Sequence, residues 1–166
     1  MHVAPEQCFL ERFKKMDNLD YTTVDMESPI ADVKADIQKL PFDDEIFDVV
    51  MCNHVLEHVE DLYRAVSEIM RVLKFGGYAI LQVPIEMDRE ETYEDLSVTN
   101  PREREKIFGQ YDHVRVFGRD YPKILEKAGF IVKEKNYLDD ISDETIDMYR
   151  LTRNDMMVSF RKENQV

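Results

Sequence analysis

A central apolar segment constrains the fold more than any other part of this chain of 166 residues. Residues 47–52 are apolar on both faces after their second residue, which is typical of an interior parallel strand covered by helices. Apolar residues of 59–73 then recur three or four positions apart, which predicts a helix with one buried face. We expect Gly76 or Gly77 to end this helix in a left-handed conformation, and 78–83 to form the next buried strand.

The rest of the chain also alternates between predicted strands and helices. The expected elements are a helix opened by Pro5, strands at 19–24 and 33–37, a helix from Asp120 to Gly129, and strands at 130–137 and 155–161. Alternation of this kind predicts a Rossmann-like three-layer α/β sandwich with a mostly parallel sheet. The last two strands are joined without a long crossover helix, so we expect an antiparallel hairpin at the C-terminal edge. We interpret residues 1–166 as a single domain.

Composition narrows the classes of function. The formal net charge of −13, without a run of about five basic residues, argues against binding to a nucleic-acid backbone. The sequence contains neither an apolar run of membrane-spanning length nor a signal-peptide pattern, so we expect a cytoplasmic protein without a membrane partner. Cys8 and Cys52 are too few and too far apart for a disulfide framework.

Several candidate binding residues follow predicted parallel strands directly. Ligands of such sheets bind at the carboxyl ends of the strands, beside the point where the strand order reverses. The residues at these positions are Ala4, Pro5, Glu6, Asp25, Asp36, Ile37, Asn53 and His54. An acidic residue after the second strand can accept hydrogen bonds from both ribose hydroxyls of an adenosine, and Asp25 stands there. A solvated loop aspartate is the alternative for Asp25.

The order of acidic turn, buried strand, helix, Gly-Gly turn and buried strand over residues 36–84 resembles a class I S-adenosylmethionine-dependent methyltransferase. The loop at 2–7, His-Val-Ala-Pro-Glu-Gln, is similar to that of a subgroup of the type 11-like methyltransferases. The resemblance implies S-adenosyl-L-methionine as cofactor and methyl transfer to a small-molecule or other acceptor. It places Asp36 and Ile37 beside the adenine, and Asn53 and His54 beside the methionine part of the cofactor.

The first strand departs from the family pattern in two ways. The usual glycine-rich loop is replaced by residues 2–8, in which Glu6 and Cys8 are larger than glycine. Met1 also begins inside the strand, which suggests an N-terminally truncated chain, a misassigned start or a minimal form. An incomplete central strand would favour pairing with another copy, as in a homo-oligomer.

His54 and His58 raise a different hypothesis, because residues 54–58 match the inverted zinc-protease signature HxxEH. That motif needs both histidines on one helix face. Here His54 directly follows an apolar strand, so we expect no metal site; Glu57 and His58 would instead fix the turn from strand to helix.

Residues 86–115 form a charged stretch that we interpret as a substrate-side insertion. His113 could act as a catalytic base and Arg115 could hold an anionic substrate, but an ordinary surface position is the favoured alternative for both. Tyr111 could line a substrate-side lid or simply anchor its loop. Two other functions stay open. A nicotinamide oxidoreductase would need a GxGxxG motif, which the sequence does not contain. A non-catalytic cofactor-binding or interaction module would be consistent with the incomplete first strand.

Overall fold

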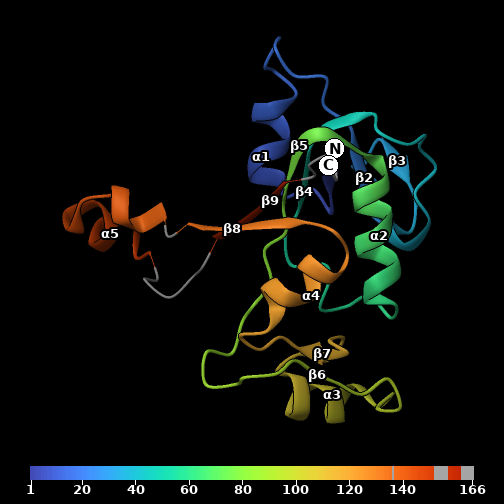
Figure 1. The fold of residues 1–166 in the computed structure, drawn as a ribbon, viewed down its shortest axis with the longest axis vertical. Coiled ribbons are helices and arrows are strands. Elements are labelled where there is room, and N and C mark those ends of the chain that lie inside the picture. The colour runs from blue at the N-terminus through green and yellow to red at the C-terminus, as the bar shows by residue number, and fades with distance from the viewer. Residues whose placement is uncertain (136, 152–156, 162–166) are drawn as a thin grey trace.

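The computed structural model describes residues 1–135, 137–151 and 157–161. Within these residues, seven strands form one mixed sheet in the order β3-β2-β1-β4-β5-β9-β8 (Figure 1). The strands are β1 (His2–Val3), β2 (Thr23–Asp25), β3 (Val33–Lys34), β4 (Phe47–Cys52), β5 (Leu73–Ile80), β8 (Ile131–Lys135) and β9 (Met157–Arg161). The first five are parallel, whereas β9 is antiparallel to both β5 and β8. The predicted parallel sheet and C-terminal antiparallel hairpin are therefore confirmed.

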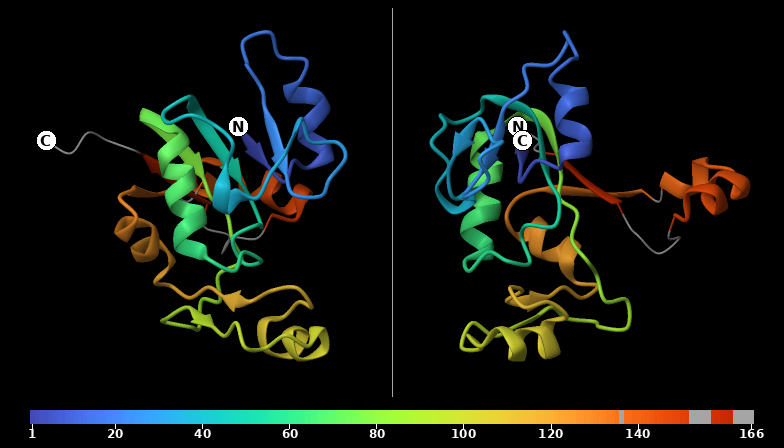
Figure 2. Two further views of the ribbon diagram at one scale, coloured as in Figure 1. Left: turned by 90° about the vertical axis from the view of Figure 1, so that its right-hand side faces the viewer. Right: turned by 180° about the vertical axis from the view of Figure 1, so that it is seen from behind.

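Helices cover both faces of this sheet. The chain crosses from β1 to β2 through α1 (Gln7–Phe13) and from β4 to β5 through α2 (Leu62–Val72), in opposite directions across the sheet. Because such parallel crossovers are right-handed, α1 and α2 fall on opposite faces, as Figure 2 shows. The short helix α4 (Tyr121–Lys127) precedes β8. Apolar side chains between these layers form the core.

Helix α2 begins and ends for identifiable reasons. The Asp61 side chain accepts a hydrogen bond from the backbone amide of Arg64 at 2.9 Å and so caps the first turn. One helix face is buried, as the apolar spacing predicted. The prediction that a glycine ends α2 is wrong, because Leu73 is already extended and begins β5. Gly76, with a φ of +78°, lies within β5, where the register against β4 shifts.

The central position of β1 is confirmed. Its two residues pair in parallel with β2 on one side and with β4 on the other. The side chains of His2 and Val3 are both buried. Backbone hydrogen bonds extend the pairing to Ala4, whose amide donates to the carbonyl of Val24 at 2.8 Å. The loop that follows β1 therefore leaves the middle of the sheet at its carboxyl edge.

Much of the chain between β5 and α4 lies at the carboxyl end of the parallel strands (Figure 1). It contains β6 (Tyr93–Glu94) and β7 (Arg115–Val116), which pair in antiparallel fashion, and α3 (Pro101–Phe108) between them. Beyond β8, the 3-10 helix η2 (Tyr137–Asp140) and α5 (Asp143–Tyr149) complete the described elements. None of the described helices has the length and apolar character needed to cross a membrane.

Candidate cofactor site

A cavity of about 410 Å³ opens at the carboxyl ends of β1, β2 and β3 and beside the loop after β4. Its lining residues are Val3, Ala4, Asp25, Met26, Ala35, Asp36, Ile37, Gln38, Val55, His58, Val59 and Glu60. The structure thus brings together Ala4, Asp25, Asp36 and Ile37, as the strand-end rule led us to expect. It does not place the other four candidates, Pro5, Glu6, Asn53 and His54, in the lining.

Only one oxygen of the Asp25 carboxylate forms hydrogen bonds within the described residues. Its Oδ1 accepts hydrogen bonds from the backbone amides of Glu27 and Ser28, both at 2.7 Å. These bonds hold the loop after β2 in a tight turn. Within the described residues no hydrogen bond to Oδ2 is formed. This second oxygen is therefore available to a hydroxyl in the cavity.

Asp36 and Ile37 border the same cavity from the 3-10 helix η1 (Ile37–Lys39). The carboxylate of Asp36 caps η1 through the backbone amide of Gln38 at 2.8 Å, and the Gln38 side-chain amide lies 3.0 Å from Oδ2. The Ile37 side chain is buried and presents an apolar wall. A carboxylate beside an apolar wall suits a flat heterocycle with an exocyclic amine.

The loop after β1 contributes a network of polar side chains instead of a glycine-rich turn. Ala4 has a φ of +48°, in the left-handed region that usually favours glycine. The Glu6 carboxylate contacts Nε2 of buried His2, and it accepts a hydrogen bond from Nδ2 of Asn53 at 3.1 Å. Nδ1 of His2 lies 2.6 Å from the Tyr21 hydroxyl. Glu6 is therefore fixed at the edge of the site by contacts with His2 and Asn53.

Burial shifts two pKa values in this network. The pKa of His2 is lowered, chiefly because burial disfavours its charged form. Burial, together with the nearby Glu6 and Asp32 carboxylates, raises the pKa of Tyr21 to about 12. A neutral phenol therefore faces His2 at physiological pH.

The loop between β4 and α2 does not form the helix that the HxxEH signature requires. Residues 54–61 contain turns and bends but no helix, and α2 begins only at Leu62. His54 has a φ of +53° and a side chain that is 56% exposed, with Nδ1 3.4 Å from Oε1 of Glu57. His54 and His58 consequently do not share a helix face.

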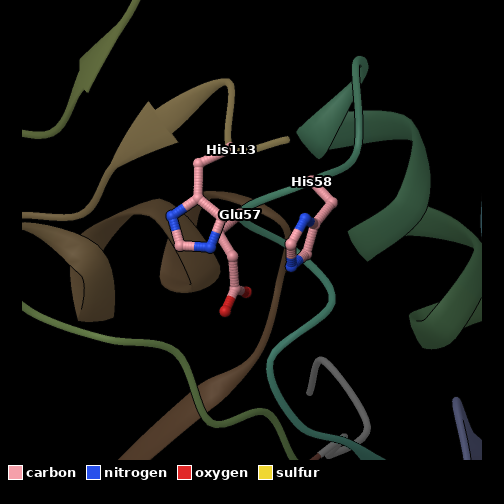
Figure 3. A group of neighbouring side chains, drawn as sticks. All are labelled: Glu57, His58 and His113. Carbon is pink, nitrogen blue, oxygen red and sulfur yellow. The ribbon is translucent and has the colours of Figure 1, made fainter. Parts of the chain in front are cut away.

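Three side chains that the sequence analysis did not combine meet beside the cavity. Glu57, His58 and His113 each offer a ligand atom, and these atoms all lie within 4.8 Å of one another (Figure 3). Glu57 is buried, whereas the two histidines are partly exposed. Glu57 and His58 precede α2, but His113 lies far along the chain, just before β7. Only the HxxEH match hinted at this cluster, and it named His54 in place of His113.

Arg115 was expected to contact the substrate, but the structure buries its side chain completely. The guanidinium donates hydrogen bonds to the backbone carbonyls of Leu56 and Val59, and to that of Glu60 at 3.1 Å. Its Nε also donates to the Glu94 carboxylate at 2.7 Å. Arg115 therefore holds the loop before α2 instead of facing the solvent. Tyr111 is 61% exposed.

Met26, Gln38, Val59 and Glu60 also line the cavity without having been singled out from the sequence. Met26 directly follows Asp25, and Gln38 directly follows Ile37, so proximity to a predicted residue was the available signal. Val59 and Glu60 gave no chemical signal of their own.

Comparisons with known proteins show which proteins this chain is similar to. The model of a family described as a methyltransferase domain matches residues 7–81. A 2-phytyl-1,4-naphtoquinone methyltransferase of Nostoc punctiforme is 44% identical over 52 residues, covering 31% of this chain and 23% of that protein. The chain spans 15–41% of the length of the curated relatives that it matches.

Solved structures show the same fold at low sequence identity. A SAM-dependent methyltransferase from Archaeoglobus fulgidus superposes with a TM-score of 0.58 at 19% identity, covering 97% of this chain and 84% of that chain. The [4+2]-cyclase SpnF superposes with a TM-score of 0.56 at 16% identity, covering 99% and 75% of the two chains. Residues 7–81 therefore match the model of the methyltransferase domain family, and the chain has the fold of the class I S-adenosylmethionine-dependent methyltransferases.

Proposed function

We propose that the protein binds S-adenosylmethionine in the 410 Å³ cavity and transfers its methyl group to a small-molecule acceptor. The observation that carries this proposal is the convergence of Asp25 and Asp36 on one cavity from the ends of neighbouring strands. The volume lies within the range of roughly 300–1,000 Å³ that is typical of small-molecule sites. The family match supports methyl transfer as the reaction class.

Each adenosine contact follows from the chemistry of the lining. The Oδ2 atom of Asp25 would accept hydrogen bonds from the ribose hydroxyls, because Oδ1 is already engaged by its own loop. The adenine would lie against Ile37, with its amine donating to the Asp36 carboxylate. That carboxylate would then be shared with, or released by, the side chain of Gln38. The left-handed backbone at Ala4 lets the loop turn away from the ligand.

The methionine end of the cofactor would lie toward Asn53 and His54 at the end of β4. The Asn53 side chain is anchored to Glu6, while its buried Oδ1 has no hydrogen-bond partner within the described part of the chain. An unpaired buried carbonyl oxygen is unfavourable, and an ammonium group of the ligand would satisfy it.

The acceptor would approach from residues 86–115. A hollow of about 600 Å³ adjoins the cofactor cavity, shares Gln38 and Glu60 with it, and is lined from the insertion by Thr92, Glu94 and Leu96. The sulfonium is already activated, so the protein needs to align the acceptor with the methyl group and exclude water. His113, beside the same loop, remains our proposed base for an acceptor that must lose a proton.

Calorimetric titration with S-adenosylhomocysteine, the demethylated product, tests the cofactor site. We expect saturable binding by the wild type and at least tenfold weaker binding by Asp25→Asn and by Asp36→Asn, because each loses a charged acceptor worth about 1.5–3 kcal/mol. Asp48→Asn is the matched control, since Asp48 is an exposed carboxylate at the opposite end of β4. Equal affinities for all four proteins would refute the assignment.

A cofactor-binding protein without methyl transfer is the second candidate, because the fold neighbour SpnF is a cyclase. Formation of S-adenosylhomocysteine from S-adenosylmethionine in the presence of fractionated small molecules distinguishes the two. Turnover with any fraction establishes methyl transfer. Binding without turnover in all fractions favours the second candidate.

We also propose that a second copy of the chain pairs at the sheet, as the short β1 suggests. β1 has two residues beside the six of β4, so it covers only part of its neighbour. Sedimentation equilibrium measures this directly: a dimer supports pairing, and a monomer over the whole concentration range contradicts it.

A further inference from the structure

We propose that Glu57, His58 and His113 form a binding site for a divalent transition-metal ion, with Zn²⁺ the best match. Their three ligand atoms lie within 4.8 Å of one another, and Figure 3 shows the two imidazole rings and the carboxylate gathered at one point. Two histidines and one carboxylate are the donor set of many zinc sites that keep an open coordination position. The inference goes beyond methyl transfer and does not depend on it. It replaces the role of base proposed above for His113, because an imidazole that binds a metal through Nε2 and donates through Nδ1 has no free lone pair for a proton.

The state of Glu57 is the first observation that points to an ion. The residue is only 2% exposed, yet its Oε2 has no hydrogen-bond partner within the described residues. A buried carboxylate oxygen without a partner is strongly unfavourable. The other oxygen, Oε1, lies 3.4 Å from Nδ1 of His54. A cation bound between Glu57 and the two histidines would satisfy the free oxygen.

The surroundings of the two histidines supply the second observation. Nδ1 of His58 lies 3.3 Å from Oδ2 of Asp112, and Nδ1 of His113 lies 3.3 Å from the carbonyl oxygen of Phe108. Metal-binding histidines usually donate their second ring nitrogen to a carboxylate or a backbone carbonyl, which fixes the tautomer and the ring orientation. This arrangement leaves Nε2 of both rings for an ion.

The backbone holds the ligands in place before any ion binds. The amide of Val114, next to His113, donates to the carbonyl of Glu57 at 3.0 Å. The buried Arg115 guanidinium fixes the carbonyls on both sides of Glu57 and His58. Two chain segments that are far apart in sequence are therefore joined at the cluster itself, as a preorganised site requires.

The separations suit a small ion after modest side-chain rotation. Zinc bound to nitrogen and oxygen at about 2.0–2.2 Å in tetrahedral geometry places its ligands roughly 3.3–3.6 Å apart. The ligand atoms, now within 4.8 Å, would need to close by roughly 1 Å. His58 also lines the cofactor cavity, so an open coordination position would adjoin bound ligand.

Calorimetric titration of the chelator-treated protein with Zn²⁺ at neutral pH tests the site, with visible absorption of bound Co²⁺ as a second readout. We expect one ion per chain and a tetrahedral Co²⁺ spectrum. Glu57→Gln and His113→Asn should bind at least roughly 100-fold more weakly, and Asp112→Asn roughly 10–100-fold more weakly, because it removes only an outer partner. Circular dichroism confirms that each variant is folded.

Two controls separate this site from other metal ligands. His54→Asn should stay within about threefold of the wild type, because Nδ1 of His54 lies beside Oε1 of Glu57, whereas the ion would bind the free Oε2. Cys8→Ser excludes binding by the exposed thiol. The proposal is overturned if the wild type binds Zn²⁺ no more tightly than His113→Asn, or if His54→Asn loses as much affinity. If a ligand variant does not fold, two other results test the site. Weaker Zn²⁺ binding by Asp112→Asn together with a tetrahedral Co²⁺ spectrum of the wild type supports the proposal, and unchanged binding by Asp112→Asn without such a spectrum overturns it.

Discussion

Replacing Arg115 with lysine should destabilise the whole protein, although lysine keeps the positive charge. The guanidinium is fully buried and donates to three backbone carbonyls, those of Leu56, Val59 and Glu60, and to the Glu94 carboxylate. A lysine ammonium is a single compact donor group that cannot span these acceptors. At least two carbonyl oxygens would then lose their donor, at about 1–3 kcal/mol each. Allowing for local relaxation, we expect a loss of about 3 kcal/mol.

Urea unfolding followed by circular dichroism measures this loss. For a chain of this size a loss of about 3 kcal/mol should also lower the melting temperature by about 6–12 °C. Arg119→Lys is the matched control, because Arg119 is 51% exposed and its pair with Glu90 is worth under about 1 kcal/mol. If Arg115→Lys were as stable as Arg119→Lys, the anchoring role would be refuted, and a role in substrate binding would again be the better explanation.

Three further changes test other parts of the account. Glu68→Gln should lower the free energy of unfolding at neutral pH, because hydrogen bonds from Arg71 hold the pKa of Glu68 below its usual value. The stability that Glu68 contributes is present above its unfolded-state pKa and is lost as pH falls through its folded-state pKa, so the variant should lose less stability in acid than the wild type. Urea midpoints from pH 7 to pH 3 would show this difference, and parallel curves for the two proteins would contradict it. Gly118→Ala should destabilise by more than about 1 kcal/mol in thermal unfolding, because the added Cβ would lie 2.7 Å from the Glu91 backbone; an unchanged melting temperature would contradict that clash. Leu81→Ala should cost about 2–5 kcal/mol in urea unfolding, because Leu81 is fully buried, and a cost below about 1 kcal/mol would show that it lies outside the core.

The sheet and the meeting of Asp25 and Asp36 at one cavity could be predicted because both depend on local patterns. Apolar periodicity identified the strand–helix–strand unit, and parallel strands align their carboxyl ends whatever the loop sequences are. The position of Asp25 and Asp36 after neighbouring parallel strands was therefore enough to predict that both line one cavity. The end of α2 was misplaced, since Gly76 can end a helix or form a bulge with the same left-handed φ.

The cluster of Glu57, His58 and His113 and the burial of Arg115 could not be predicted because both depend on contacts between distant segments. His113 meets Glu57 only because the segment before β7 returns to the carboxyl end of the parallel strands. Arg115 lies in a charged stretch, where an arginine is usually exposed. Its side chain is nevertheless buried, because it donates hydrogen bonds to the backbone carbonyls of the loop before α2. Asn53 likewise ends an apolar strand as expected, but its partner Glu6 comes from the loop after β1.

A crystal structure of the protein with S-adenosylhomocysteine is the most direct test of the proposed cofactor site. We predict that the ribose hydroxyls lie within hydrogen-bond distance of the Asp25 carboxylate and that the adenine packs on Ile37 beside Asp36. Density for the ligand in another hollow, such as the one lined by Arg119 and Lys123, would contradict the account.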